Sequence, residues 1–242
     1  ASFTWVVDTT DPAASIDTQP ADNNNNNDDG SFTFSGTDAT SGVASFECNF
    51  DGGSYAACTS PHDVGNDLAD GTHTLDVRAI DNSANTGAAA SASWTVDDTA
   101  PSATIASEPS NPTADNDDAT FTFTGDDGAG TGVASFECSF DGGDYATCVS
   151  GADMGDGLAD GTHTFAVRAI DNSANTGSSA STSWVVDTTA PSASIDTQPA
   201  NNNNDDDDGV FTFSGDDGAG VGGMTFTCSF DSGVYAACTS PH

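Results

Sequence analysis

Hydrophobic and polar residues alternate along six short segments, and the same pattern returns later in the chain. In the first copy the segments are 13–17, 31–36, 44–52, 54–61, 71–81 and 91–97. A period of two is typical of strands that bury one face, and no segment shows the period of a helix. The sequence therefore predicts an all-β fold.

The alternation also predicts which side chains of the first copy point inward. On each segment the apolar residues occupy every second position, so they share one face of the strand. The predicted core residues are Phe32, Phe34, Phe46, Cys48, Phe50, Leu75, Val77, Ala79, Trp94 and Val96. These aromatic residues are therefore assigned to a core rather than to a cofactor site.

Tryptophan and cysteine motifs show that the chain is a tandem repeat. Cys48, Cys138 and Cys228 are spaced 90 residues apart, and GTHT-x-x-VRAIDNSANTG occurs twice with the same spacing. This period fits an Ig-like β-sandwich better than a solenoid of shorter units. We expect head-to-tail Ig-like repeats with these boundaries: 1–8 is the last strand of a preceding repeat, 9–98 and 99–187 are repeats, and 188–242 is an incomplete repeat.

The six cysteines form three pairs whose members lie ten positions apart, Cys48–Cys58, Cys138–Cys148 and Cys228–Cys238. A turn centred near Gly53 would place Cys48 and Cys58 opposite each other, within the distance that a disulfide spans. A zinc site would need four clustered ligands, and a redox cysteine would need a basic neighbour. Disulfides imply an oxidising compartment, so we expect an extracellular or cell-surface protein.

The charge of the chain is extreme and almost entirely aspartate. The formal net charge is -36, the only basic residues besides histidine are Arg78 and Arg168, and the only glutamates are Glu47, Glu108 and Glu137. Nucleic acids and anionic membrane surfaces would repel such a chain, and no apolar run is long enough for membrane insertion. Cations are the expected partners. Halophilic adaptation is an alternative explanation that is compatible with this one.

Topology predicts where the aspartates gather. In an Ig-like sandwich, the start of the first strand, the loop after the second strand and the loop before the last strand lie at one end. This end of each repeat would meet Asp28, Asp29, Asp67 and Asp70, or their counterparts, from the preceding repeat. The predicted metal ligands are Asp8, Asp38, Asp81, Asn85, Asp97, Asp98, Asp126, Asp127, Asp171, Asn175, Asp187, Asp216 and Asp217.

A structural Ca²⁺ ion would relieve the repulsion in such a cluster, because calcium accepts six to eight oxygen ligands from irregular loops. The alternative is a set of solvated acidic turns with no defined site. For the loops rich in asparagine and aspartate, 23–29 and 201–208, the second interpretation is preferred.

The ordered motifs VDTTAPSASI, FTFSGDDGAG, FECSFDGG, LADGTHTFAVRAIDNSANTG and SWVVD resemble the bacterial Ig-like repeats of very large secreted adhesins and surface proteins. The resemblance implies an Ig-like stalk that binds calcium between domains. By residue, it implies that Asp8, Asp97 and Asp187 are the linker aspartates of that family. Its D-x-A-G-N loop corresponds to Asp81 with Asn85 and to Asp171 with Asn175, with Ala84 and Ala174 in place of its glycine.

No catalytic motif is present, and His73 and His163 recur at the start of a predicted strand, where a structural corner role is expected. We therefore expect a non-enzymatic extracellular spacer or filament module. Its partners would be neighbouring repeats of the same chain, with lateral self-assembly into a fibre as an open question. The alternatives are a ligand-binding adhesin module and a surface-layer component of a halophile.

Overall fold

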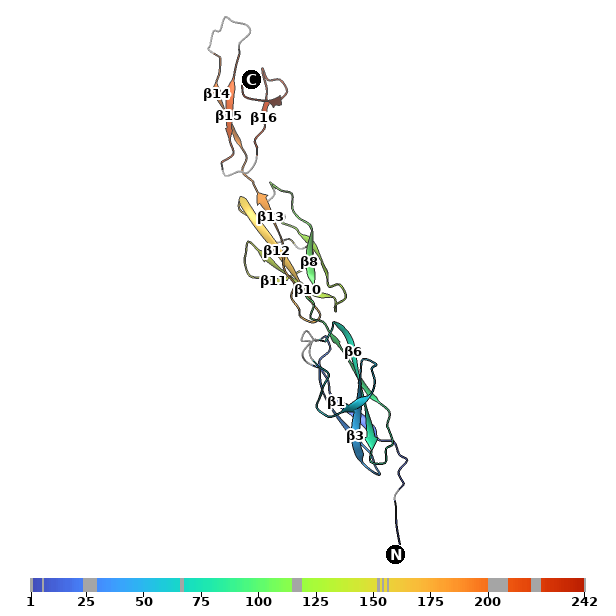
Figure 1. Cartoon of the computed structure of the whole chain (residues 1–242). Coiled ribbons are helices and arrows are strands. Elements are labelled where there is room, and N and C mark those ends of the chain that lie inside the picture. Colours follow the sequence, from blue (N-terminus) through green and yellow to red (C-terminus); the bar gives the residue numbers. More distant parts are fainter. Residues whose placement is uncertain are drawn as a thin grey trace. The chain divides into compact units, whose positions relative to one another are not determined.

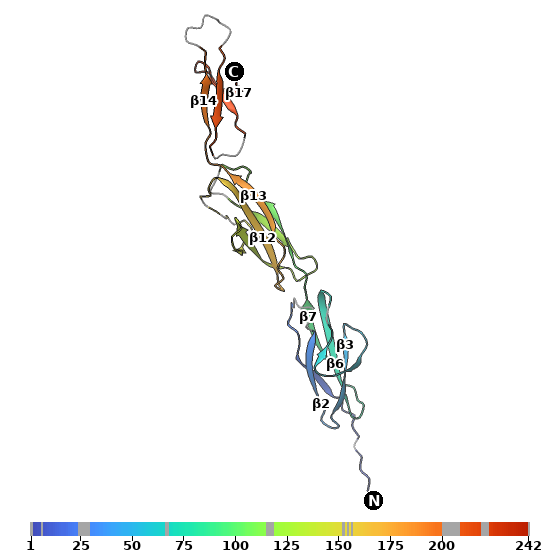
Figure 2. The same cartoon turned by 60° about the vertical axis from the view of Figure 1, so that its left-hand side comes forward.

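The computed structural model describes residues 2–5, 7–23, 30–65, 68–114, 119–151, 153, 155, 157–199, 209–218 and 223–241. Within these ranges every regular element is a strand and none is a helix (Figure 1; Figure 2 shows the same strands from a second direction). The predicted all-β fold class is confirmed. The described residues contain no helix with the length and apolar character needed to cross a membrane.

The described residues fall into two compact units. The first comprises 1–103, 125–135 and 168–178, and the second comprises 104–124, 136–167 and 179–242. Within the first unit, Thr131 and Asn175 of the loops in 125–135 and 168–178 donate hydrogen bonds to Asp97. The repeat boundaries expected from the sequence stay a prediction.

The first repeat forms two sheets, ordered β1-β2-β5 and β4-β3-β6-β7. The strands are β1 (Ala13–Thr18), β2 (Ser31–Thr37), β3 (Val43–Phe50), β4 (Ala56–Cys58), β5 (His62–Asp63), β6 (Gly71–Asp81) and β7 (Ala90–Val96). Six of them overlap the predicted segments, although β4 covers only three residues of the segment 54–61. The short strand β5 was not predicted, because two residues are too few to show alternation.

The second and third repeats follow the same order of strands. The second has β8 (Ser102–Ser107), β9 (Thr122–Asp126), β10 (Val133–Phe140), β11 (Ala146–Cys148), β12 (Gly161–Asp171) and β13 (Ala180–Val186). Its sheets are β8-β9 and β11-β10-β12-β13. The third has β14 (Ser192–Thr197), β15 (Thr212–Asp216), β16 (Phe226–Cys228) and β17 (Ala236–Cys238), paired as β14-β15 and β16-β17.

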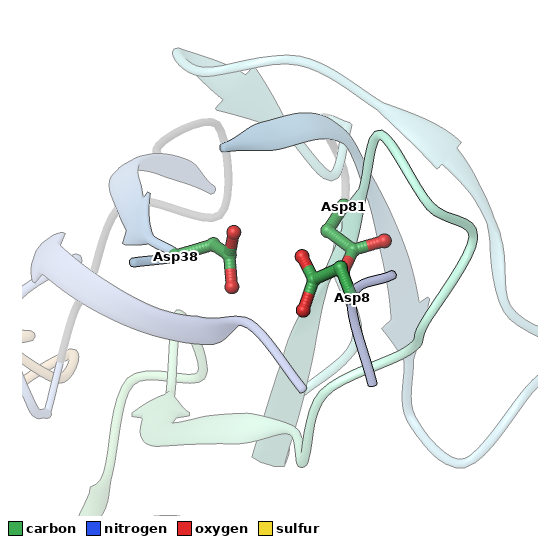
Figure 3. A group of neighbouring side chains, drawn as sticks. All are labelled: Asp8, Asp38 and Asp81. Atoms are coloured by element: carbon green, nitrogen blue, oxygen red, sulfur yellow. The ribbon is translucent and has the colours of Figure 1, made fainter. Parts of the chain in front are cut away.

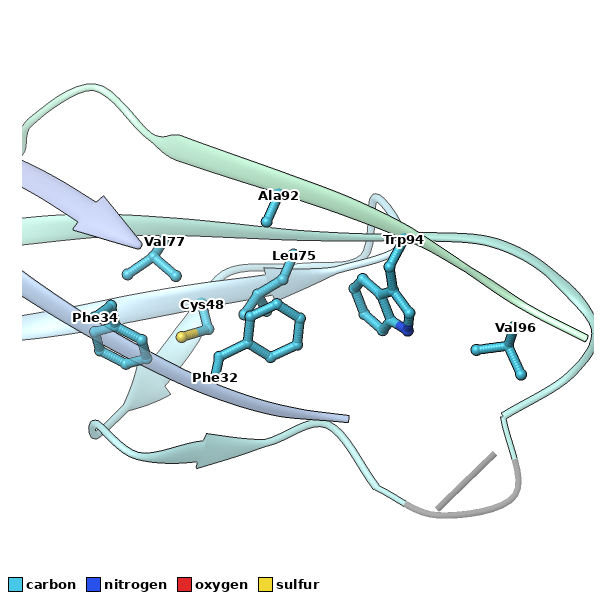
Figure 4. Packing of buried hydrophobic residues seen from close by; sticks show 8 residues of the cluster. All are labelled: Phe32, Phe34, Cys48, Leu75, Val77, Ala92, Trp94 and Val96. Atoms are coloured by element: carbon cyan, nitrogen blue, oxygen red, sulfur yellow. The ribbon is translucent and has the colours of Figure 1, made fainter. Parts of the chain in front are cut away.

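The core of the first repeat lies between its two sheets. Phe32 and Phe34 of β2 face Leu75 and Val77 of β6 and Trp94 of β7 (Figure 4). The Phe32 and Trp94 rings meet edge to face with their centroids 4.9 Å apart, a favoured aromatic geometry. Two sheets that share one apolar core define a β-sandwich, as the sequence predicted.

The second repeat builds the same core with one more aromatic ring. Phe165 occupies the position of Leu75, and its ring stacks on Phe121 with a centroid distance of 4.1 Å. Trp184 meets Phe121 edge to face at 5.0 Å and is 1% exposed. The exchange of Leu for Phe is accommodated by stacking inside the same sandwich.

The third repeat presents its apolar face as an open hollow of about 830 Å³. Phe213 and Phe226 line it, while Ile195 and Phe230 are 65% and 74% exposed. In the first repeat the equivalent face is covered by β6 and β7. These two strands have no counterpart among the described residues of 188–241, which explains the exposure.

All three predicted disulfides are present, each with a Cα–Cα distance of 5.8 Å. The predicted register was wrong, because the observed pairing is shifted by two residues along β4. Cys48 lies opposite Ala56 and Cys58 lies opposite Phe46, so the bridged residues are diagonal neighbours. The reason is that the turn is closed by the hydrogen bond from the Gly53 amide to the Phe50 carbonyl, one residue earlier than expected.

The two basic residues of the strands have structural partners. Arg78 donates from Nε and Nη2 to one oxygen of Glu47, at 2.9 and 2.7 Å. Its guanidinium also stacks over Tyr55 at 3.9 Å from the ring centroid. This ion pair connects the neighbouring strands β3 and β6.

His73 forms the corner predicted at the start of β6. Its Nδ1 lies 2.7 Å from the Asp51 carboxylate, and its Nε2 lies 2.7 Å from the backbone carbonyl of Ala69. His163 makes the same contacts to Asp141 and Ala159. Because both ring nitrogens face acceptors, the doubly protonated imidazolium satisfies both hydrogen bonds at once.

We expect these histidines to make stability depend on pH. Burial lowers the pKa of His73, but the hydrogen bonds to Asp51 and Ala69 outweigh it, and the net pKa is raised. The Ala159 carbonyl and the Asp141 carboxylate likewise raise the pKa of His163. The stabilisation is therefore complete below about pH 6.5, the unfolded value, and is lost as the pH rises through the folded value.

Urea unfolding at about pH 6 and at about pH 9 measures this effect as a lower free energy of unfolding at the higher pH. Replacing both His73 and His163 by glutamine should flatten the dependence in this range. His62→Gln is the matched control and should leave the dependence intact. A double variant with the wild-type slope would contradict this assignment.

Candidate metal centres

Two groups of three aspartates bring their carboxylate oxygens together. Asp8, Asp38 and Asp81 form the first triad (Figure 3), and Asp97, Asp127 and Asp171 form the second. Within each triad the nearest carboxylate oxygens all lie within 4.8 Å of one another. Each triad takes one residue from a linker, one from the loop after β2 or β9, and one from the end of β6 or β12.

The loop after β6 fixes the third aspartate of the first triad. The Asp81 carboxylate accepts hydrogen bonds from the Ser83 and Asn85 amides, both at 2.8 Å. This tight loop places Ala84 in the left-handed region with φ of 68°, and Ala174 has φ of 67° in the equivalent loop. Glycine adopts this conformation without steric cost, whereas alanine is strained in it.

The loop after β2 wraps around the carboxylate of Asp38. One oxygen of Asp38 accepts the backbone amides of Thr40, Ser41 and Gly42 at 3.1, 2.7 and 2.7 Å. These hydrogen bonds outweigh burial, which acts in the opposite direction, and lower the pKa of Asp38. The carboxylate is thereby held in its charged form.

The linker aspartate of the second triad is almost completely buried. Asp97 is 1% exposed, and one of its oxygens accepts the amide and the hydroxyl of Thr131, both at 2.7 Å. Asp127 and Asp171 are 7% and 2% exposed. Three carboxylates in one buried place repel one another strongly unless a proton or a cation compensates for the charge.

Asp127 shows this repulsion most directly. Its pKa is raised by burial and by the charges of Asp97 and Asp171, despite a hydrogen bond from the Gly132 amide at 2.7 Å. Its other oxygen, Oδ1, is buried and has no hydrogen-bond partner among the described residues. Asp8 and Asp38 in the first triad each have one such oxygen as well.

The donor set matches a hard divalent cation. All six ligand side chains are carboxylates, and neither cysteine nor histidine contributes to a triad. A buried oxygen without a partner is costly, and coordination to a cation would satisfy it. Ca²⁺ suits irregular loops better than Mg²⁺, which demands a near-ideal octahedron.

Other predicted ligands lie outside the triads. Asp126 and Asp216 each accept the amide two residues ahead, from Gly128 and Gly218, and so close a local turn. Asp98 instead interacts with Asp70, whose hydrogen bond and charge raise the pKa of Asp98. Of the pairs Asp97–Asp98 and Asp126–Asp127, only Asp97 and Asp127 therefore reach a triad.

Asn85 and Asn175 lie beside the triads with their amide nitrogens turned toward oxygen. Asn175 Nδ2 lies 2.8 Å from Asp171 Oδ2 and 2.7 Å from the Asp97 carbonyl. Asn85 makes the same contacts to Asp81 and Asp8, at 2.8 and 3.1 Å. In this arrangement the asparagines position the linker and the aspartate.

The third predicted centre has two of its residues in the chain. Asp187 and Asp217 occupy the positions of Asp97 and Asp127, and Asp217 Oδ1 is also buried without a partner in the described ranges. The position equivalent to Asp171 falls after residue 242. Asp28, Asp29 and Asp67, expected near the linkers, lie outside the described residues.

Two glycines near the triads were missed in the sequence. A Cβ at Gly87 would lie 1.8 Å from the Pro12 carbonyl oxygen, and one at Gly177 would lie 1.9 Å from the Pro101 carbonyl oxygen. Only glycine allows the linker to lie this close to the loop before the last strand. The signal in the sequence was the repeated ANTG motif.

No family model matches the chain, and no curated protein matches it. Among solved structures, it is similar to the fibronectin(III)-like modules of Clostridium thermocellum CbhA. The sequence identity is 17%, the match covers 72% of this chain and 94% of that chain, and the TM-score is 0.38.

Proposed function

We propose that this chain is an extracellular structural spacer made of β-sandwich repeats that calcium stiffens at their linkers. The single observation that carries the proposal is the buried triad of Asp97, Asp127 and Asp171, with its unpartnered carboxylate oxygen on Asp127. A cation bound there would connect the linker to two loops that are distant in sequence. It would thereby restrict bending at the linker.

The disulfides support the extracellular location. Every cysteine is paired within a β-hairpin, and no free cysteine remains. Such disulfides persist in oxidising compartments and are rare in the reducing cytosol. The net charge of -36 also keeps neighbouring chains apart unless cations screen it. Lateral assembly into a fibre stays a prediction.

Repetition supports a structural rather than a catalytic role. The two triads and the two histidine corners recur at equivalent positions, as expected of features that maintain a fold. Neither corner histidine has a hydroxyl or a thiol among its hydrogen-bond partners in the described residues. The histidines are instead engaged by a carboxylate and a carbonyl at each corner.

Calorimetric titration with CaCl₂ tests the calcium proposal. We expect two binding events in the wild-type chain, one for each complete triad. Replacing Asp127 and Asp171 by asparagine should weaken one event by about tenfold or more, because fewer charged ligands remain. The other event should persist.

Asp126→Asn is the matched control, since Asp126 is adjacent in sequence but lies outside the triad. It should leave both binding events intact. The proposal fails if wild-type protein binds no calcium, or if the Asp126 variant loses as much affinity as the Asp127 and Asp171 variant. Binding that follows ionic strength alone would favour a halophilic surface protein with solvated acidic loops.

A further inference from the structure

In each complete repeat, one aspartate outside the triads accepts hydrogen bonds from the linker after the last strand. These aspartates are Asp70 and Asp160. Asp160 Oδ1 accepts the amide of Thr188 at 2.8 Å and its hydroxyl at 2.7 Å. Asp160 Oδ2 accepts the hydroxyl of Thr189. Both carboxylate oxygens are therefore occupied by uncharged donors.

The same arrangement occurs in the first repeat. Asp70 Oδ1 accepts the amide of Asp98 at 2.9 Å, and Asp70 Oδ2 accepts the hydroxyl of Thr99. One instance lies in each compact unit, so the contact does not depend on how the units are placed. Its recurrence indicates a feature encoded by the repeat.

Strand register explains why an aspartate occupies this position. Gly161 lies opposite Val186 at the end of the β12–β13 ladder, and Gly71 lies opposite Val96 in β6–β7. The preceding residue, Asp160 or Asp70, thus faces the first linker residues beyond the ladder. Gly161 and Gly71, with φ of 144° and 136°, allow the chain to enter the strand there. The carboxylate replaces the backbone acceptor that the ladder no longer supplies.

We propose that Asp160 and Asp70 are linker latches that order the residues after the last strand without any bound cation. The latch differs from the triads in its hydrogen bonding. Both carboxylate oxygens of Asp160 already accept hydrogen bonds, so neither needs a cation as a partner. It goes beyond the calcium proposal and stands whether or not the triads bind metal. A linker ordered in advance would also lower the entropic cost of cation binding at the next triad.

The two latches are not equivalent. Thr188 donates its hydroxyl to Asp160, whereas Asp98 stands at the same position in the first linker and brings a second carboxylate to Asp70. The charge of Asp70 opposes ionisation of Asp98. The Asp160 latch should therefore hold its linker more firmly than the Asp70 latch.

Backbone ¹⁵N relaxation of the whole chain in the presence of a chelator tests the proposal at Thr188 and Thr189. This linker suits the test because Asp187 belongs to no aspartate triad among the described residues. We expect order parameters near the rigid value of about 0.85 in the wild type, falling below about 0.6 in Thr189→Val combined with Asp160→Ala. Thr189→Ser retains the donor and should remain rigid.

Unchanged amide shifts for β12 and β13 would confirm that the variants fold. The proposal is overturned if the wild-type linker is flexible in chelator. It is also overturned if the Thr189→Val and Asp160→Ala variant keeps wild-type order parameters. Absence of calcium binding would contradict the triad proposal but would not change the order parameters measured in chelator. The two proposals can therefore be distinguished.

Discussion

Replacing Trp184 by alanine should destabilise the second repeat by about 3–5 kcal/mol, the usual cost of deleting a large buried aromatic side chain. Trp184 is 1% exposed, and its ring lies 5.0 Å from Phe121 and 5.6 Å from His163. Its removal leaves a cavity between the two sheets that the surrounding rings cannot fill. Scanning calorimetry should show a lower melting temperature for one transition only.

Trp5 provides the matched control, because it occurs in the same sequence motif but is 73% exposed in this chain. Trp5→Ala should leave all transitions within experimental error of the wild type. Equal losses for the two variants would mean that the core described here does not carry the stability of the repeat.

Removing the second disulfide by replacing Cys138 and Cys148 with alanine should lower the stability of that repeat by about 2–3 kcal/mol. The bridge closes a short loop and ties the three-residue strand β11 to β10. Without it, a strand this short has little to hold it at the edge of the sheet. Urea unfolding measures the loss.

Reduction of the wild-type protein provides an independent check on the disulfides. A phosphine reductant should reproduce the loss seen in the cysteine variant and extend it to the first repeat, because Cys48 and Cys58 form an equivalent bridge. Unfolding curves that are the same with and without the reductant would contradict a stabilising role for the disulfides.

Much of the fold can be predicted from alternation alone. The residues expected to point inward, such as Phe32, Leu75 and Trp94, are buried because a two-residue period on a half-buried strand leaves one choice of face. The disulfide pairs followed from their spacing. Their register did not, because moving the centre of the glycine-containing turn by one residue shifts the opposite residue by two, which leaves the same side chains facing inward.

The candidate site was predictable by region but not by residue. In the loop after β9, Asp126 and Asp127 are adjacent, and neighbouring residues in a turn point in different directions. The shorter loop of the first repeat indicates which aspartate is the ligand. Its Asp38 is equivalent to Asp127, whereas the position of Asp126 is taken by Thr37. The sequence placed Asp70 and its counterpart Asp160 near a linker, but not the hydrogen bonds of Asp160 to Thr188 and Thr189, because these depend on the strand register that brings Asp160 to a linker 28 residues later.

Thermal unfolding with Ca²⁺ or Mg²⁺ at fixed ionic strength tests the central claim most directly. Saturating calcium should raise the melting temperature by roughly 10 °C or more, since ligand at about 100 times its dissociation constant stabilises by about 2.7 kcal/mol. Chelation should reverse the rise, and magnesium should give far less. An equal rise with both ions, or one that depends only on ionic strength, would contradict a calcium-stiffened spacer.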